Sequence, residues 1–167
     1  MCIRDRCGIE AALFEKNDEK LERGIREDLM LHAYMLTQSG IPMLYSSDEV
    51  GRLNDYSYKD DPDKAADSRY IHRGAFQWDL AKKRKSKTSV EGQIFQTLSR
   101  MEQIRRQESV FDKDCDVYTY DVHDDSILCI LRQKGNERFI GIFNFSDSEK
   151  TCLLYTTDAA DEARSVD

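Results

Sequence analysis

A helical pattern with one apolar face leads directly into a short apolar segment near the start of the chain. Apolar side chains and one histidine recur every three or four residues within Glu19–Ser39, which places them on one face of a helix. The residues on this face are Leu21, Ile25, Leu29, His32 and Leu36. Gly40 follows, and glycine readily adopts the positive φ that ends helices. Ile41–Tyr45 is apolar without alternation, which predicts a strand buried on both faces. A helix joined at once to such a strand predicts an α/β fold.

A second helix and three strands are predicted further along the chain. Thr88 and Glu91 have the spacing of a capping box, so a helix should begin there and continue to about Arg106. Its buried stripe is expected to comprise Ile94, Leu98, Met101 and either Ile104 or Arg105. The hydrophobic period then changes to two, which predicts three strands joined by hairpin turns. These strands are Val117–Val122, Ile127–Arg132 and Phe139–Phe145.

Both ends of the chain resemble translated adapter sequence from DNA library preparation. Residues 1–6 match one strand of a transposon adapter, and the stretch from Cys152 to Glu162 matches the opposite strand. The alternative is a natural frayed terminus at each end. We expect residues 1–6 and 152–167 to be artefacts that should be excluded from fold reasoning. Residues 7–151 are then expected to be a piece of a longer gene.

Charge and cysteine content exclude several classes of protein. The net charge of −7 at pH 7 argues against a general nucleic-acid binder, and no apolar run approaches the length of a membrane span. Without the two ends, Cys7, Cys115 and Cys129 remain, with no CxxC pair. A Cys115–Cys129 bridge is conceivable, but reduced thiols in a cytoplasmic protein are expected, while secretion stays open because the true N-terminus is expected upstream.

Two charged segments have ordinary explanations. Asp112–Asp116 has the opening spacing of a calcium loop, but Val117 and His123 replace the glycine and glutamate that such a loop needs, so no metal site is expected. The basic run Lys82–Lys87 is interpreted as a solvated surface rather than a nucleic-acid contact. His32 is expected to be a partly buried packing residue.

A long polar stretch, from about Ser46 to Ser89, combines carboxylates and arginines with aromatic side chains. The aromatic residues are Tyr56, Tyr58, Tyr70, Phe76 and Trp78. Long loops in compact domains are often functional, and this composition suits a sugar site. A surface excursion held by a few aromatic side chains explains it equally well.

The segment Gly40–Gly51 resembles the end of the catalytic barrel in glycoside hydrolase family 13, the α-amylase family. Asp48 and Glu49 match the family's Gly-Asp-Glu signature, with Ser47 where glycine is usual. The continuation Leu53-Asn54-Asp55, and then Asp67-Ser68-Arg69-Tyr70-Ile71-His72-Arg73, is similar to the amylosucrases of that family. The similarity covers nearly all of residues 8–148.

This resemblance implies a fold and a function. Residues 7–110 would be the end of a (β/α)8 barrel, and residues 111–151 the start of an antiparallel C-terminal β domain. Amylosucrases transfer the glucosyl unit of sucrose to an α-1,4-glucan without a cofactor. An α-glucoside hydrolase, or a family member that has lost catalysis and acts in binding, is the alternative. The partners are then sucrose and α-glucan, with neither nucleic acid nor membrane.

The resemblance also implies one site residue. Arg69 matches an arginine at the floor of the sugar pocket that pairs with an acid earlier in the chain, and we expect it to bind substrate. The alternative is that Arg69 only pairs with Asp67 or another loop acid. The nucleophile, the acid/base and a third carboxylate are expected upstream, so no catalytic residue is assigned here. Asp48 and Glu49 are expected to be structural supports, and His72 and Arg73 match without an assigned role.

Overall fold

The structure, a computed structural model, describes residues 7–151. It combines helices with one three-stranded antiparallel sheet, so its composition is α/β in character. The chain divides into two compact units, with the division between Glu108 and Ser109. The two ends that resemble adapter sequence, residues 1–6 and 152–167, lie outside the described residues.

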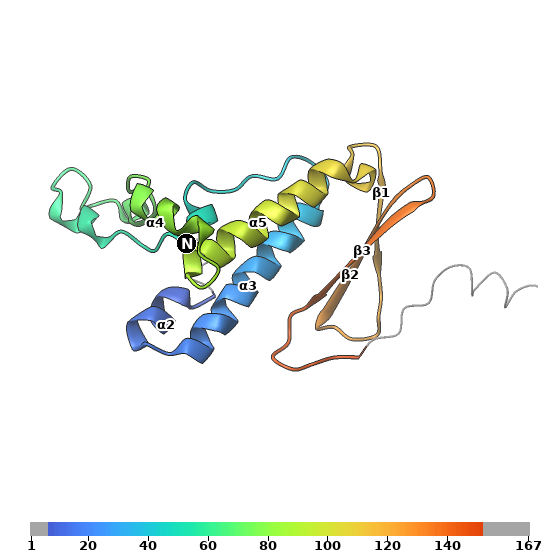
Figure 1. The fold of residues 1–167 in the computed structure, drawn as a ribbon, viewed down its shortest axis with the longest axis horizontal. Coiled ribbons are helices and arrows are strands. Elements are labelled where there is room, and N and C mark those ends of the chain that lie inside the picture. Colours follow the sequence, from blue (N-terminus) through green and yellow to red (C-terminus); the bar gives the residue numbers. More distant parts are fainter. Residues whose placement is uncertain (1–6, 152–167) are drawn as a thin grey trace, which may run out of the picture. The chain divides into compact units, whose positions relative to one another are not determined.

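The first unit is helical, and α3 and α5 lie side by side in it (Figure 1). Its α-helices are α2 (Ile9–Glu15), α3 (Asp18–Thr37), α4 (Trp78–Lys82) and α5 (Val90–Gln107). Its 3-10 helices are η1 (Asp48–Val50), η2 (Tyr56–Asp60), η3 (Ser68–His72) and η4 (Lys83–Lys85).

The α3 helix confirms the predicted amphipathic pattern. The Asn17 side chain caps its first turn by accepting a hydrogen bond from Lys20 N at 3.0 Å. On the predicted apolar face, three side chains are buried and two are half-buried; in chain order they are Leu21, Ile25, Leu29, His32 and Leu36. The helix ends at Thr37, and Gly40 turns the chain three residues later with φ +94°.

The cap of α5 corrects the predicted capping box by one residue. Ser89, not Thr88, is the N-cap, and its Oγ accepts a hydrogen bond from Gly92 N at 3.1 Å. With the cap at Ser89, Glu91 stands at the second helical position, one short of the position from which it could reach back to the cap. Glu91 forms an ion pair with Lys83 Nζ at 3.1 Å instead.

The core of the first unit lies between α3, α5 and the start of α2. Its buried members are Cys7, Ile9, Ile25, Ile94 and Leu98. Of the two residues proposed for the end of the α5 stripe, Arg105 continues it and Ile104 is exposed. Arg105 donates hydrogen bonds from Nη1 to the carbonyls of Leu36 and Gln38, the latter at 3.2 Å, and from Nη2 to Gly40 O at 2.8 Å.

The prediction of a doubly buried strand at Ile41–Tyr45 is wrong in this structure. The segment is extended but belongs to no sheet, and Ile41 and Met43 are 91% and 82% exposed. Pro42 and Leu44, which alternate with them, are half-buried. A strand needs neighbours for its backbone groups, and the described part of the first unit offers none.

The second unit contains the predicted three-stranded sheet. Its strands are β1 (Asp116–Tyr120), β2 (Ile127–Lys134) and β3 (Glu137–Asn144), antiparallel in the order β1-β2-β3. Lys134 pairs with Glu137, which confirms a tight hairpin between β2 and β3. The short helix η5 (Ser109–Phe111) precedes the sheet, and buried Arg132 donates from Nε to Val110 O at 2.8 Å.

The two isoleucines of α5 provide a matched test of the core. We expect Ile94→Ala to lower the free energy of unfolding by about 2–5 kcal/mol, because Ile94 is fully buried and its truncation leaves a cavity. Ile104→Ala, on the same helix at 38% exposure, should cost less than about 1 kcal/mol. Urea denaturation of the two variants measures the difference, and equal losses would contradict this core.

Candidate functional site

Most of the residues that carried the resemblance, from Ser46 to Arg73, lie in one loop of the first unit, residues 46–77, which we call the site loop. It comes directly after the extended segment and ends at α4. Three short 3-10 helices, η1, η2 and η3, organise it. Asp55 and Asp67 cap η2 and η3, since their side chains accept hydrogen bonds from Ser57 N and Arg69 N, each at 3.0 Å.

Arg69 stands at the surface, on η3, and is engaged by Asp67. Its Nε donates to both carboxylate oxygens of Asp67, at 2.8 and 3.1 Å, and its Nη2 donates to Oδ2 at 2.8 Å. The side chain is 72% exposed. Nη1 takes part in none of these bonds, so one edge of the guanidinium is held while the other keeps N–H donors for a further acceptor.

The Asp67–Arg69 pair sets the charge state of this turn. The hydrogen bonds from the Arg69 side chain, and next the one from its backbone N–H, lower the pKa of Asp67 to about 2. The pKa of Arg69 is raised, first by the same side-chain hydrogen bond and then by the charge of Asp67. Both groups are therefore charged at neutral pH.

His72 and Arg73 take different positions at the end of η3. The backbone carbonyl of His72 accepts a hydrogen bond from Tyr45 Oη at 3.1 Å. His72 also borders a small cavity of about 20 Å³, large enough for roughly one water molecule. The cavity's other lining residues are Tyr45, Ser46, Asp48, Arg52, Leu53 and Asn54. The Arg73 guanidinium lies 5.6 Å from the centre of the Tyr70 ring.

A buried polar cluster joins α3 to η1. His32 is 1% exposed, which corrects the expectation of a partly buried packing residue. Its Nδ1 lies 2.8 Å from the backbone oxygen of Asp28, and its Nε2 lies 3.9 Å from Asp48 Oδ2. Asp48 belongs to a 3-10 turn rather than to a strand, and it is buried while Glu49 is half-exposed. Through this cluster, Asp48 packs the beginning of the site loop against α3.

Arg52 is the residue that sequence reasoning missed. It is 8% exposed, and its Nη1 donates to Gly74 O at 2.5 Å while Nη2 lies 3.6 Å from Asp55 Oδ2. The spacing of Arg52 and Asp55, three residues apart, was the one available signal. An arginine in a polar loop is normally exposed, so that signal could not show that this one is buried.

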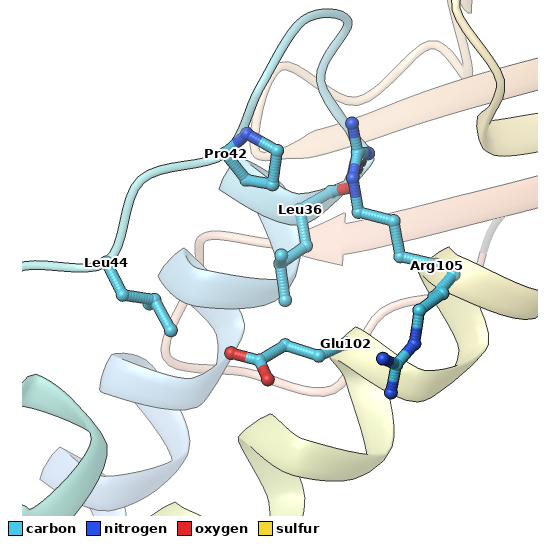
Figure 2. A pocket seen from close by; sticks show the side chains of 6 residues that line it. Leu36, Pro42, Leu44, Glu102 and Arg105 are labelled. Carbon is cyan, nitrogen blue, oxygen red and sulfur yellow. Dashed lines mark hydrogen bonds between the residues drawn. The ribbon is translucent and has the colours of Figure 1, made fainter.

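A larger groove lies apart from Arg69, between the extended segment and the two long helices. It encloses about 390 Å³ and is lined by Leu36, Pro42, Leu44, Glu102, Arg105 and Arg106. Figure 2 shows Leu36, Pro42 and Leu44 on one side of it and Glu102 and Arg105 on the other. Arg105 already binds three carbonyls here. We therefore interpret the groove as the solvent-facing side of the contact between α5, the end of α3 and the extended segment.

The aromatic side chains of the polar stretch are partly exposed. Trp78 is 74% exposed and meets Phe76 edge-on, with ring centres 4.8 Å apart. Lys59 Nζ lies 5.7 Å from the centre of the Tyr56 ring. These contacts are compatible with a sugar-binding surface and with a loop held by its aromatic residues.

Several other expectations concern residues 7–151. Within that range no group of three or more His, Cys, Asp or Glu residues could hold a metal ion, and Lys134 Nζ instead binds Asp112 and Asp114, at 2.6 and 3.0 Å. Cys7, Cys115 and Cys129 are thiols. Of the helices described, none has both the length and the apolar character to cross a membrane.

The chain was also compared with known protein families, and no family model matches it. A function is therefore inferred from the residue pattern and from the way in which the site loop is folded.

The Asp67–Arg69 pair can be tested by titration. We expect the pKa of Asp67 to rise from about 2 towards its ordinary value in Arg69→Gln, because the side-chain hydrogen bonds are lost. It should stay somewhat low, since the backbone N–H at position 69 remains. Because the pKa of Asp67 is lower in the folded state, the pair stabilises the fold fully above about pH 3.9. This stabilisation is lost as the pH falls through about 2.

Carbon-detected NMR of the carboxyl groups would measure this pKa. Asp124, whose pKa is also about 2 because of Ser126 and Lys150, is the control that should not move. An unchanged Asp67 pKa in the variant would show that Arg69 does not engage it.

Proposed function

We propose that this chain is part of a retaining α-glucoside-active enzyme of glycoside hydrolase family 13, specifically an amylosucrase. Such an enzyme would transfer the glucosyl unit of sucrose to an α-1,4-glucan and release fructose. The observation that carries the proposal is the ordered pattern Asp48-Glu49-Val50-Gly51-x-Leu53-Asn54-Asp55 and then Asp67-Ser68-Arg69-x-x-His72-Arg73.

The folding of the site loop supports the proposal. The two halves of the pattern are separated in sequence but are hydrogen-bonded to each other. Asp55 N donates to Ile71 O at 2.9 Å, and Arg52 Nη1 donates to the carbonyl of Gly74, the residue directly after the second half, at 2.5 Å. A substrate site built from both halves needs such contact, because its groups must be held in fixed relative positions.

Arg69 is the residue that we propose to bind substrate. A guanidinium suits this role because its planar donors can hold a carboxylate on one edge and a sugar hydroxyl on another. Asp67 occupies the Nε edge, and Nη1 of this exposed side chain remains for the second task. The pair with Asp67 thus orients the guanidinium and leaves donors for a sugar.

The covalent chemistry is assigned to the parent protein, the full-length product of the gene. A retaining mechanism requires a carboxylate nucleophile and a carboxylic acid/base about 5–5.5 Å apart. In this proposal both precede Cys7, together with a third carboxylate. Asp48 packs against His32 and is 9% exposed, so it is assigned a structural role. The 167-residue chain alone is expected to be inactive.

The proposal also gives the segments places in a barrel. The α3 helix, Ile41–Tyr45, the site loop and α5 would be the seventh helix, eighth strand, eighth loop and eighth helix of a (β/α)8 barrel, with the sheet beginning a C-terminal domain. Exposed and half-buried side chains alternate along Ile41–Tyr45. This alternation fits the placement, because one side of a barrel strand faces helices and the other faces the interior. A cytoplasmic location is part of the same proposal.

The first test is the DNA that flanks this sequence, and the second is the activity of the parent protein. The proposal predicts three upstream strand ends that carry the catalytic carboxylates, and release of fructose with growth of a glucan from sucrose. Glucose in place of glucan would identify a hydrolase. Absence of the carboxylates would identify a family member that acts only in binding, and would contradict the proposal.

In the parent protein, we expect Arg69→Ala to lower kcat/KM for sucrose by about 10-fold or more, the effect of losing a hydrogen bond from a charged donor. Lys87→Ala, which removes an exposed cation outside the site loop, is the control and should leave kcat/KM unchanged. Near-normal kinetics of Arg69→Ala would remove the assignment.

A further inference from the structure

Three backbone carbonyls, two at the end of η3 and one just after it, accept hydrogen bonds from Tyr45 and from residues in the first part of the site loop. Ile71 O accepts from Asp55 N at 2.9 Å, His72 O from Tyr45 Oη at 3.1 Å, and Gly74 O from Arg52 Nη1 at 2.5 Å. Arg52 and Gly74 are 22 residues apart, so this last bond closes most of the site loop. Closing a loop of this size costs chain entropy, which the closing contacts must offset.

Arg52 is an unusual choice for such a contact, because its side chain is only 7% exposed. Burial of a guanidinium is unfavourable unless it has hydrogen-bond acceptors and a nearby negative charge. Gly74 O supplies an acceptor, and Asp55 Oδ2 at 3.6 Å supplies the charge. Hydrogen bonds from Ser57, from its side chain and then its backbone, lower the pKa of Asp55, and the charge of Arg52 acts in the same direction. Asp55 is therefore ionised at neutral pH.

Gly74 completes the arrangement because it has no side chain. A Cβ at this position would overlap Arg52 Nη2 and Asp55 Oδ2, far inside contact distance. The backbone of Gly74 thus approaches the Arg52–Asp55 pair as closely as it does only because it is glycine. We call Arg52, Asp55 and Gly74 together the clasp.

We propose that Arg52 is a positioning residue, which through the clasp fixes the η3 turn and so holds Arg69 where it meets substrate. The effect on catalysis rests on the proposed function. The clasp itself rests on the geometry alone. Arg69 is exposed, and its guanidinium is bound by Asp67, which belongs to the same turn. The Asp67–Arg69 pair lies within the turn and does not anchor it to the rest of the fold. The position of the Arg69 guanidinium therefore depends on the hydrogen bonds that hold the chain at Ile71, His72 and Gly74.

Two variants open the clasp by different means. Arg52→Ala removes the donor, whereas Gly74→Ala keeps the arginine and introduces a methyl group where the guanidinium lies. In the parent protein we expect each to lower kcat/KM for sucrose by about 10-fold, through the loss of a charged hydrogen bond. If both act through the clasp, kcat/KM of the double variant should be no lower than that of the less active single variant, because the two changes remove one shared contact.

Amide hydrogen exchange provides a readout that is independent of sucrose. Both variants should speed exchange in the peptide that spans residues 68–74 while α3 and α5 stay protected. Arg84→Ala is the matched control, since it removes another arginine bond to a backbone carbonyl, Ala81 O at 2.8 Å, outside the site loop. It should alter neither exchange in residues 68–74 nor the kinetics. If Arg52→Ala fails to fold, Gly74→Ala carries the test.

The outcomes are distinguishable. Faster exchange with lower, non-additive kcat/KM supports the proposal. Faster exchange with unchanged kinetics, or unchanged exchange in both variants, overturns it. If the unaltered parent protein does not use sucrose, the proposed function fails, and exchange alone then decides whether Arg52 holds the turn.

Discussion

The side chain of Arg105 controls the point at which three segments of the first unit meet. Its bonds satisfy the carbonyl of Leu36, in the last turn of α3, and those of Gln38 and Gly40 just beyond the helix. Because Arg105 belongs to α5, the same bonds fix α5 against the end of α3. They also define where the chain leaves the helix, so the extended segment, and after it the site loop, starts from a fixed place.

The helices on either side of this point were predictable from local pattern, whereas the extended segment between them was not. The apolar faces of α3 and α5 each repeat within one segment of sequence, and the two helices bury those faces against each other. A strand depends on neighbours that are often distant in sequence. Ile41–Tyr45 has a strand's composition, but the described residues of its unit hold no strand to pair with it. Its alternating exposure reflects packing on one side only.

Ser47 is the residue at which the sequence departs from the family pattern that it resembles, and its backbone conformation gives that departure a physical meaning. It adopts φ +78°, in the left-handed region that glycine occupies without strain, at the position where the family usually has glycine. The backbone conformation therefore accounts for the usual residue, although the side chain here differs. The resemblance pointed to Arg69 through a similar match of spacing, and its role is a proposal. Arg52 occupied a variable place in that pattern, and only its burial in the fold distinguishes it.

Under the proposed function, two of the three arginines of the site loop, Arg52 and Arg69, perform different tasks. Arg52 is buried, its Nη1 donates to Gly74 O, and the Asp55 carboxylate lies 3.6 Å from its Nη2, so its guanidinium is engaged within the loop. Arg69 is exposed and held along one edge only, so its donors are available to a ligand. A binding group with spare donors is useful only if its position is defined, since a misplaced contact forfeits most of its effect. In the proposed function, the buried contacts of Arg52 hold the turn from which the exposed Arg69 binds substrate.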